Sequence, residues 1–174
     1  MILASELDLV QMICEQSARV AICARNEAVL AATAQELGGS GEVHHRRADL
    51  AVADAPAEFV DWAAERLGGL DVVVSNVSAQ AGSDFTASFQ VDIVAANSLI
   101  RAALVHLPDH AGASIVCIGS RAANVGVPWM PACAAMMAAT VSMVKSVALD
   151  VARRGIRANA PKHRPRSFKW HAES

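Results

Sequence analysis

The sequence contains no tyrosine, and its aromatic residues amount to only 4% of 174 residues. Mechanisms that use a phenol as proton donor are therefore excluded. Lysine and arginine number 15 against 17 acidic residues, so the net charge of −2 offers no basic field for nucleic acid or an acidic membrane surface. Charged residues at Glu6, Asp8, Arg25 and Asp54 interrupt the apolar stretches, which argues against a membrane-spanning run.

The four cysteines, Cys14, Cys23, Cys117 and Cys133, are widely spaced and form no C-x-x-C pair. Neither a zinc site nor a disulfide framework is therefore expected. Cys23 and Cys117 lie in strand-like runs, which favours buried, inert thiols over reactive ones. The first residues lack the basic region and continuous apolar run of a secretion signal, so we expect a cytoplasmic protein.

Two kinds of segment alternate along this chain, whose hydrophobic fraction is 53%. Short apolar runs rich in β-branched residues are typical of strands, and longer alanine-rich stretches have helical periodicity. The alternation predicts repeated βαβ units. The expected strands are Ala18 to Cys23, Glu42 to Arg46, Leu70 to Ser75, Ser114 to Gly119 and Ile156 to Asn159, and the expected helices are Asn26 to Leu37, Ala55 to Leu67, Phe85 to Leu107 and Trp129 to Arg153.

The breaks between these segments carry helix-ending and helix-starting residues. Glycines from Gly38 to Gly41 and at Gly68 end the first two helices, and Asp54 is expected as an N-cap with Pro56 in the first turn. Strands that are apolar on both faces favour a parallel sheet covered by helices on both sides. We therefore expect a doubly wound α/β domain over residues 1–160, followed by a basic, disordered tail over residues 161–174.

Six motifs in order, from about Ala18 to Ala160, resemble the short-chain dehydrogenase/reductase family. They are ARVAICARNEAVL, the ADL at 48 to 50, LDVVVSNVSA with its Ser75-Asn76-Val77-Ser78, FQVDI, SIVCIGS, and VSMVKSVALDVARRGIRANA. One such motif is weak support, whereas six in order are strong. The resemblance implies a Rossmann-like fold and a nicotinamide dinucleotide as cofactor.

The resemblance also implies where a dinucleotide would bind. The residue just after the second strand of such a fold meets the adenosine ribose, and an acid there favours NAD. Here Ala24 stands in that place and Arg25 follows, so a guanidinium could pair with a 2′-phosphate, which favours NADP. A solvated arginine is the alternative. Asp49 matches the family's adenine contact, or it caps a turn, and Asn76 matches the family's N-N-A-G motif.

The family's catalytic groups are a serine, a tyrosine 13 residues later, a lysine four residues after that, and an asparagine. By resemblance these positions are Ser120, Cys133, Met137 and Asp92. A cysteine is too short to reach where the phenol would, and a methionine carries no charge. General acid–base catalysis, worth typically ~10² to 10⁴ in rate, is then expected to be lost.

The two ends of the sequence also depart from the family. Ala4-Ser5-Glu6 stands where glycines should approach the pyrophosphate, and the family's central first strand would have to precede Met1. The strands at 18–23 and 70–75 would then face an unfilled slot. After Ala160 the family's P-G motif and substrate lobe do not follow. We therefore expect a Rossmann-like sheet that lacks its first strand and the C-terminal substrate lobe; an altered reading frame at the ends is another explanation.

The combined hypothesis is an NADP-type oxidoreductase by lineage that is inactive as a dehydrogenase or reductase. Two alternatives stay open. One is a non-catalytic module that forms a homo-oligomer through helices 85–107 and 129–153. The other is a weak nucleotide binder without turnover, through Arg25, Asp49 and Asn76. The substrate is not inferred, because the lobe that selects it is missing from the pattern.

Overall fold

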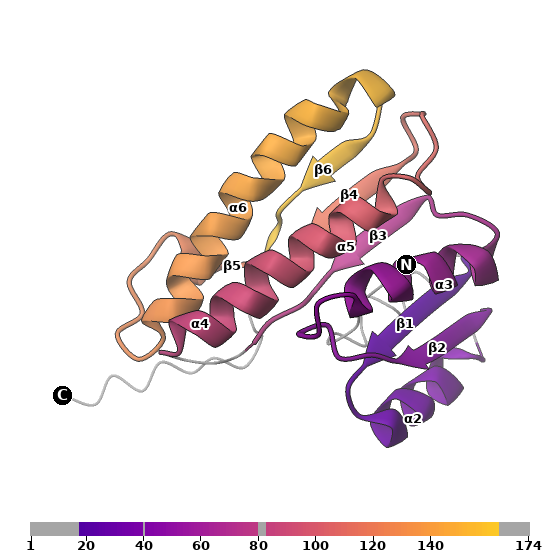
Figure 1. Ribbon diagram of the computed structural model, residues 1–174, viewed down its shortest axis with the longest axis horizontal. Helices are drawn as coiled ribbons and strands as arrows, with labels where there is room; N and C mark the ends of the chain where they lie inside the picture. The colour runs from indigo at the N-terminus through magenta and orange to yellow at the C-terminus, as the bar shows by residue number, and fades with distance from the viewer. Residues whose placement is uncertain (1–17, 40, 80–82, 164–174) are drawn as a thin grey trace.

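The computed structural model describes residues 18–39, 41–79 and 83–163. Strands and helices alternate along the chain, as the sequence predicts (Figure 1). In chain order the elements are β1 (Val20–Ala24), α2 (Glu27–Leu37), β2 (Val43–Arg47), α3 (Ala55–Leu67), β3 (Val72–Ser75), α4 (Phe85–Ser88), the π-helix η1 (Phe89–Ala95), α5 (Ala96–Ala103), β4 (Ser114–Cys117), β5 (Gly119–Ser120), the 3₁₀ turn η2 (Arg121–Ala123), α6 (Pro131–Val151), the 3₁₀ turn η3 (Ala152–Arg154), β6 (Arg157–Asn159) and β7 (Lys162–His163).

All strand pairings among the described residues are parallel. β1 pairs with β2, β3 and β6 flank β4, and β5 pairs with β7. These pairings confirm the predicted parallel α/β fold. Within the described part of the chain no strand joins β1 to β3, which are the two strands that the sequence analysis placed on either side of a slot.

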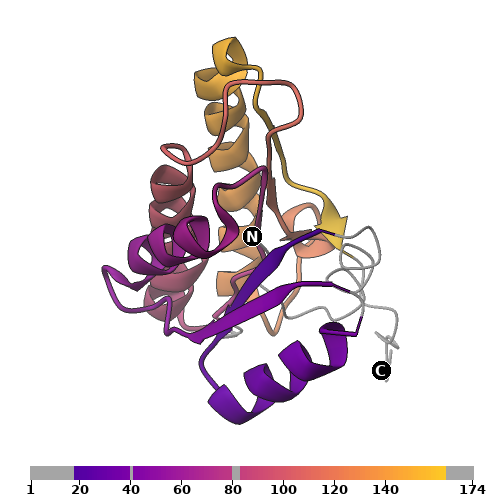
Figure 2. The ribbon, with the colours of Figure 1, turned by 90° about the vertical axis from the view of Figure 1, so that its right-hand side faces the viewer.

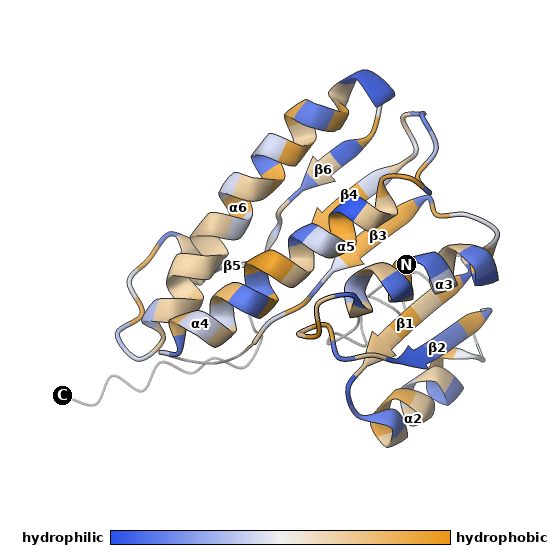
Figure 3. Cartoon of the chain, in the orientation of Figure 1, coloured by the Kyte–Doolittle hydropathy of each residue, from blue (hydrophilic) through white to orange (hydrophobic). Residues whose placement is uncertain are grey.

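Strand β1 is buried on both faces, because alternate side chains enter two different clusters. Val20 and Ile22 pack with apolar residues of α2, whereas Ala21 and Cys23 pack with residues of α3 and α5. Figure 2 shows α2 on one side of β1 and β2 and α3 on the other. Strand β2 is an edge strand of partly exposed, mostly polar residues, and it contrasts with apolar β1, β3 and β4 in Figure 3.

Local signals set most helix ends. The Asn26 side chain accepts a hydrogen bond from the Val29 amide at 3.2 Å and so caps α2. Gly68 ends α3 with a φ of 71°, a conformation that favours glycine. Asp54 is the N-cap of α3 with proline in the first turn, as expected. Its side chain makes no cap hydrogen bond with the described residues, and its backbone carbonyl accepts from the Glu58 amide at 3.0 Å.

The predicted long helix over Phe85 to Leu107 has two departures from regularity. Its middle, η1, is a π-helix that contains Asp92, and the helical run ends at Ala103, four residues early. π-Helical turns widen a helix locally and are frequent at functional sites. The early end coincides with a turn whose carbonyl oxygens are bonded to a side chain from another helix.

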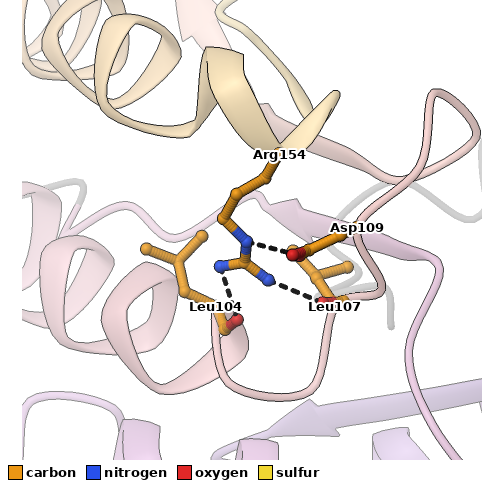
Figure 4. Close-up of polar contacts among 4 residues, drawn as sticks. All are labelled: Leu104, Leu107, Asp109 and Arg154. Atoms are coloured by element: carbon orange, nitrogen blue, oxygen red, sulfur yellow. Dashed lines mark hydrogen bonds and ion pairs between the residues drawn. The ribbon is translucent and has the colours of Figure 1, made fainter.

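That side chain is Arg154, at the end of η3. Its Nε donates to Asp109 Oδ1 at 2.6 Å, Nη1 to the Leu104 carbonyl at 2.9 Å and Nη2 to the Leu107 carbonyl at 2.8 Å (Figure 4). A helix leaves its last carbonyl groups without partners within the helix, and a guanidinium has donors arranged to take several. Arg154 therefore links the end of α6 to the end of α5.

Helix α6 differs from the expectation that charged residues interrupt every apolar stretch long enough to span a membrane. Together with η3 it covers Pro131–Arg154, which by length and composition alone is apolar enough to cross a membrane. The charged residues cited against such a run lie outside this segment, which itself contains Lys145, Asp150, Arg153 and Arg154. The core helix of a soluble protein passes the same test, and Val144 and Val151 of α6 belong to the core.

The ordered pairing extends past the expected domain boundary at residue 160. Lys162 and His163 form β7, which lies in register with Gly119 and Ser120 of β5. Two residues that the sequence analysis assigned to the tail thus belong to the parallel architecture.

Candidate functional site

A cavity of about 370 Å³ lies where β1, β2 and β3 end. Its lining includes the three residues that the sequence predicts to contact a dinucleotide: Arg25 follows β1, Asp49 follows β2 and Asn76 follows β3. Parallel strands place their carboxyl ends along one edge of a sheet, which explains why residues so far apart in sequence meet. The remaining lining is mostly apolar, such as Ala24, Ala48 and Val91.

Asp49 has the turn-capping role, which is one of the two roles that the sequence left open for it. Its Oδ1 accepts a hydrogen bond from the Ala51 amide at 3.0 Å, so it caps the turn after β2. It also lines the cavity. The hydrogen bond from Ala51 therefore orients the Asp49 carboxylate at the wall of the cavity.

The segment after β3 is held in place by Asp92. Asp92 Oδ1 accepts from the Ala79 amide at 2.8 Å, and Ala79 lines the cavity with Asn76 and Ser78. The Asp92 side chain is only 2% exposed, and its Oδ2 has no hydrogen-bond partner among the described residues. Asp92 is therefore a buried carboxyl group that fixes one wall of the cavity.

Burial raises the pKa of Asp92, and the hydrogen bond from Ala79 opposes this only in part. Burial also raises the pKa of Cys133, with a further contribution from the charge of Asp92. A carboxylate near a thiol disfavours ionisation of that thiol, because two negative charges would then lie close together. At neutral pH Cys133 is therefore a thiol and a weak nucleophile.

The other predicted catalytic positions lie near the first turns of α6, which packs against η1, β5 and η2. Ser120 Oγ accepts from the Ala122 amide at 3.2 Å and caps η2. Cys133 is partly buried, and Met137, one turn further along α6, is 5% exposed. The elements that carry the family's catalytic positions thus pack against one another, and an uncharged thioether stands at the position where the resemblance implies an ammonium group.

Cys23 and Cys117 are buried, as expected of structural thiols. Burial raises the pKa of Cys117 to about 12 and moves that of Cys23 further in the same direction. Neither thiol is ionised near neutral pH.

The sequence analysis missed two features near the site. The first is Arg47, whose Nε donates to the Arg25 carbonyl at 3.0 Å. The paired arginines at the end of a polar strand were the available signal. The second is His163, whose backbone lies in register with that of Ser120, and nothing in the local sequence indicates this pairing.

Parallel strands with crossover helices on both faces, and a cavity at the strand ends, define an α/β protein of the Rossmann type. The family model of the short chain dehydrogenases matches residues 7–162. The chain belongs to the short-chain dehydrogenase/reductase family.

Individual relatives agree with this assignment. The L-fucose dehydrogenase of Mus musculus is 30% identical over 164 residues, which are 87% of this chain and 57% of the relative. A double mutant of a Serratia marcescens short-chain dehydrogenase/reductase superposes with a TM-score of 0.83 at 26% identity, over 90% of this chain and 67% of that one. An NADPH-bound short-chain oxidoreductase of Pseudomonas aeruginosa, described as having an atypical catalytic center, has a TM-score of 0.77 at 27% identity, over 90% and 66%. The chain thus spans little more than half of its curated relative.

Proposed function

We propose that this chain binds NADP(H) in the cavity at the ends of β1, β2 and β3 and does not transfer hydride by the family's tyrosine-dependent mechanism. The observation that carries the proposal is the convergence of Arg25, Asp49 and Asn76 on one cavity. The solved structure of an NADPH-bound relative supports the choice of cofactor class.

The adenosine end of the cavity has the chemistry for a 2′-phosphate. Arg25 is exposed at the end of β1 and supplies a guanidinium, which matches a phosphate with two parallel hydrogen bonds. Asp49 is the only carboxylate among the described residues that line the cavity, and it follows β2 rather than β1. A carboxylate at the end of β1 would favour the ribose hydroxyl of NAD, and Ala24, the last residue of β1, stands there instead.

The lack of turnover follows from the groups at the start of α6. A ketone reduction by NADPH needs a proton for the new alkoxide, and the family's phenol supplies it next to a lysine. Cys133 has a pKa that burial and Asp92 raise, and Met137 neither donates a proton nor carries a charge. Reduced cofactor is therefore expected to bind without a competent proton donor beside the substrate.

Fluorescence titration with NADPH tests binding, and NADPH oxidation with a panel of ketones and sugars tests turnover. We expect saturable binding and no turnover in the unmodified chain. The double variant Cys133→Tyr with Met137→Lys serves as the gain-of-function arm. Turnover by the unmodified chain contradicts the second half of the proposal, and no fluorescence response at millimolar NADPH contradicts the first.

The exposed faces of α5 and α6 favour a second role, self-association. Helix α6 is apolar over most of its length, yet only part of it is buried, and Leu149 is 81% exposed. Small residues along α6 permit close approach of another helix. The partner with a matching surface is a second copy of this chain, because two such faces bury one another.

Sedimentation velocity of the full chain tests this role. We expect a dimer that Leu149→Lys dissociates. Val29→Lys is the matched control, because Val29 is an exposed valine on α2, on the other side of the β1–β2 pair. A monomer at all concentrations of the unmodified chain contradicts the proposal.

A further inference from the structure

The turn that carries Arg25 is tied to β2 by two successive carbonyl groups. The Ala48 amide donates to the Ala24 carbonyl at 3.1 Å, and Arg47 Nε donates to the Arg25 carbonyl at 3.0 Å. On the other side of Arg25, Asn26 caps α2 through its side chain. The backbone of Arg25 is therefore fixed from both directions, although its own side chain is exposed.

Arg47 does not line the cavity that contains Arg25, but it lines a second cavity beside it. A cavity of about 200 Å³ is lined by Arg47, Ala48 and Asp49, and the last two also line the larger cavity. Arg47 thus stands where the two cavities adjoin. Its Nε is used by the Arg25 carbonyl, while Nη1 and Nη2 form no hydrogen bond or ion pair with the described residues.

The neighbouring Arg46 differs from Arg47 in its contacts. Side chains alternate between the faces of a strand, and the Arg46 guanidinium carbon lies 5.9 Å from the ring centroid of Trp62, on α3. Arg46 also lines the smaller cavity, but its guanidinium is held on this aromatic ring. Only Arg47 is bonded to the turn that carries Arg25.

An anion that meets two guanidinium groups gains charge-assisted hydrogen bonds from both of them. A phosphate monoester carries a charge of about −1.5 to −2 at pH 7 and three acceptor oxygens, enough for two arginines. A ribose 2′-hydroxyl offers neither. The pair therefore discriminates between two ligands that differ by a single phosphate.

We propose that Arg47 is a specificity-determining residue that positions Arg25 and completes a two-arginine site for the 2′-phosphate of NADP(H). This inference rests on the proposed binding of NADP(H) at the larger cavity. It assigns the preference for a 2′-phosphate to a residue on β2, 22 positions away from the arginine that the sequence pattern indicates.

Calorimetric titration of the full chain with adenosine 2′,5′-bisphosphate and with 5′-AMP tests the proposal, because these two probes differ only by the 2′-phosphate. We expect the unmodified chain to prefer the bisphosphate. Arg47→Ala should reduce that preference at least about tenfold, the effect of losing one charge-assisted hydrogen bond. Arg46→Ala is the matched control and should leave the ratio of affinities unchanged.

Arg47→Lys separates charge from position. It keeps a cation but loses the Nε donor to the Arg25 carbonyl, and we expect a preference between those of the unmodified chain and Arg47→Ala. A merely structural role of Arg47 would weaken both probes equally and leave their ratio unchanged, which overturns the inference. Circular dichroism confirms that each variant is folded.

The outcomes also distinguish this inference from the proposed function. If the unmodified chain binds neither probe, the proposed cofactor binding fails and the inference with it. If the chain prefers the bisphosphate and Arg47→Ala retains that preference while Arg25→Ala loses it, the proposed function stands and the role of Arg47 is refuted.

Discussion

Replacing Arg154 by alanine is expected to lower the free energy of unfolding by about 2–3 kcal/mol. The guanidinium makes three hydrogen bonds at the end of α5, two to the backbone carbonyls of Leu104 and Leu107 and one to Asp109 (Figure 4). No other described residue is bonded to these two carbonyls from a side chain. The hydrogen bonds of Arg154 therefore join the end of α5, which continues the π-helix that carries Asp92, to the end of α6, which carries Cys133.

The magnitude follows from the exposure of each partner. The two carbonyl bonds are partly buried and contribute about 1 kcal/mol each. The Asp109 side chain is 68% exposed, so its ion pair is screened by water and adds at most about 1 kcal/mol. Asp109→Ala is therefore the matched control, with an expected cost of about 0.5 kcal/mol.

Urea unfolding at pH 7, followed by circular dichroism, measures these differences. Arg154→Lys keeps the charge but loses the planar fork, so it should fall between the control and Arg154→Ala. Two results refute the reasoning: an Arg154→Ala variant as stable as the unmodified chain, or an Asp109→Ala variant that costs as much as Arg154→Ala. The second would place the stabilisation in the ion pair instead of the backbone bonds.

Two further predictions concern Asp92. Because burial raises its pKa, the folded chain holds this proton more tightly than the unfolded chain, so the contribution of this carboxyl to stability is greatest below a pH of about 4 and is lost as the pH rises through the folded pKa. Asp92→Asn should remove this loss between pH 4 and pH 8 in urea unfolding, and parallel curves for both chains would show that the carboxyl is not responsible. Cys133 should react slowly with iodoacetamide at pH 7 and faster in Asp92→Asn, because a negative neighbour that raises the pKa of its thiol is gone. Peptide mapping by mass spectrometry measures this against buried Cys117, and equal rates in the two chains would argue against the coupling.

The local pattern of apolar residues and helix-boundary residues predicted most of the helices and strands. The helix over Ala55–Leu67 has the bounds that the sequence predicts, and the strand at Ser114 begins where expected. These elements have apolar runs of clear period, and helix boundaries carry glycine, proline or asparagine. The π-helix around Asp92 has no such signal, because a local widening depends on what packs against the helix.

The residues of the candidate site likewise include some that the sequence predicted and others that it did not. Arg25, Asp49 and Asn76 were predicted because each follows a strand, and parallel strands end at a common edge. Arg47 was not predicted as a site residue, because its proposed role depends on one hydrogen bond to a residue 22 positions away. The sequence likewise did not predict that Asp92 Oδ2 is buried without a hydrogen-bond partner among the described residues, since burial of a side chain depends on neighbours that the sequence does not identify.

The sequence by itself determined the composition of the site. The lack of tyrosine and the residues Cys133 and Met137 are fixed by the chain alone, as is the alternation of strands and helices that follows from periodic apolar residues. Only the tertiary structure decided which distant groups meet: Arg154 at the end of α5, Arg47 at the Arg25 turn, and β7 beside β5. The physical reason is the distance along the sequence over which each interaction acts. Periodicity and caps act within a few residues, whereas these contacts form only when separate elements pack together.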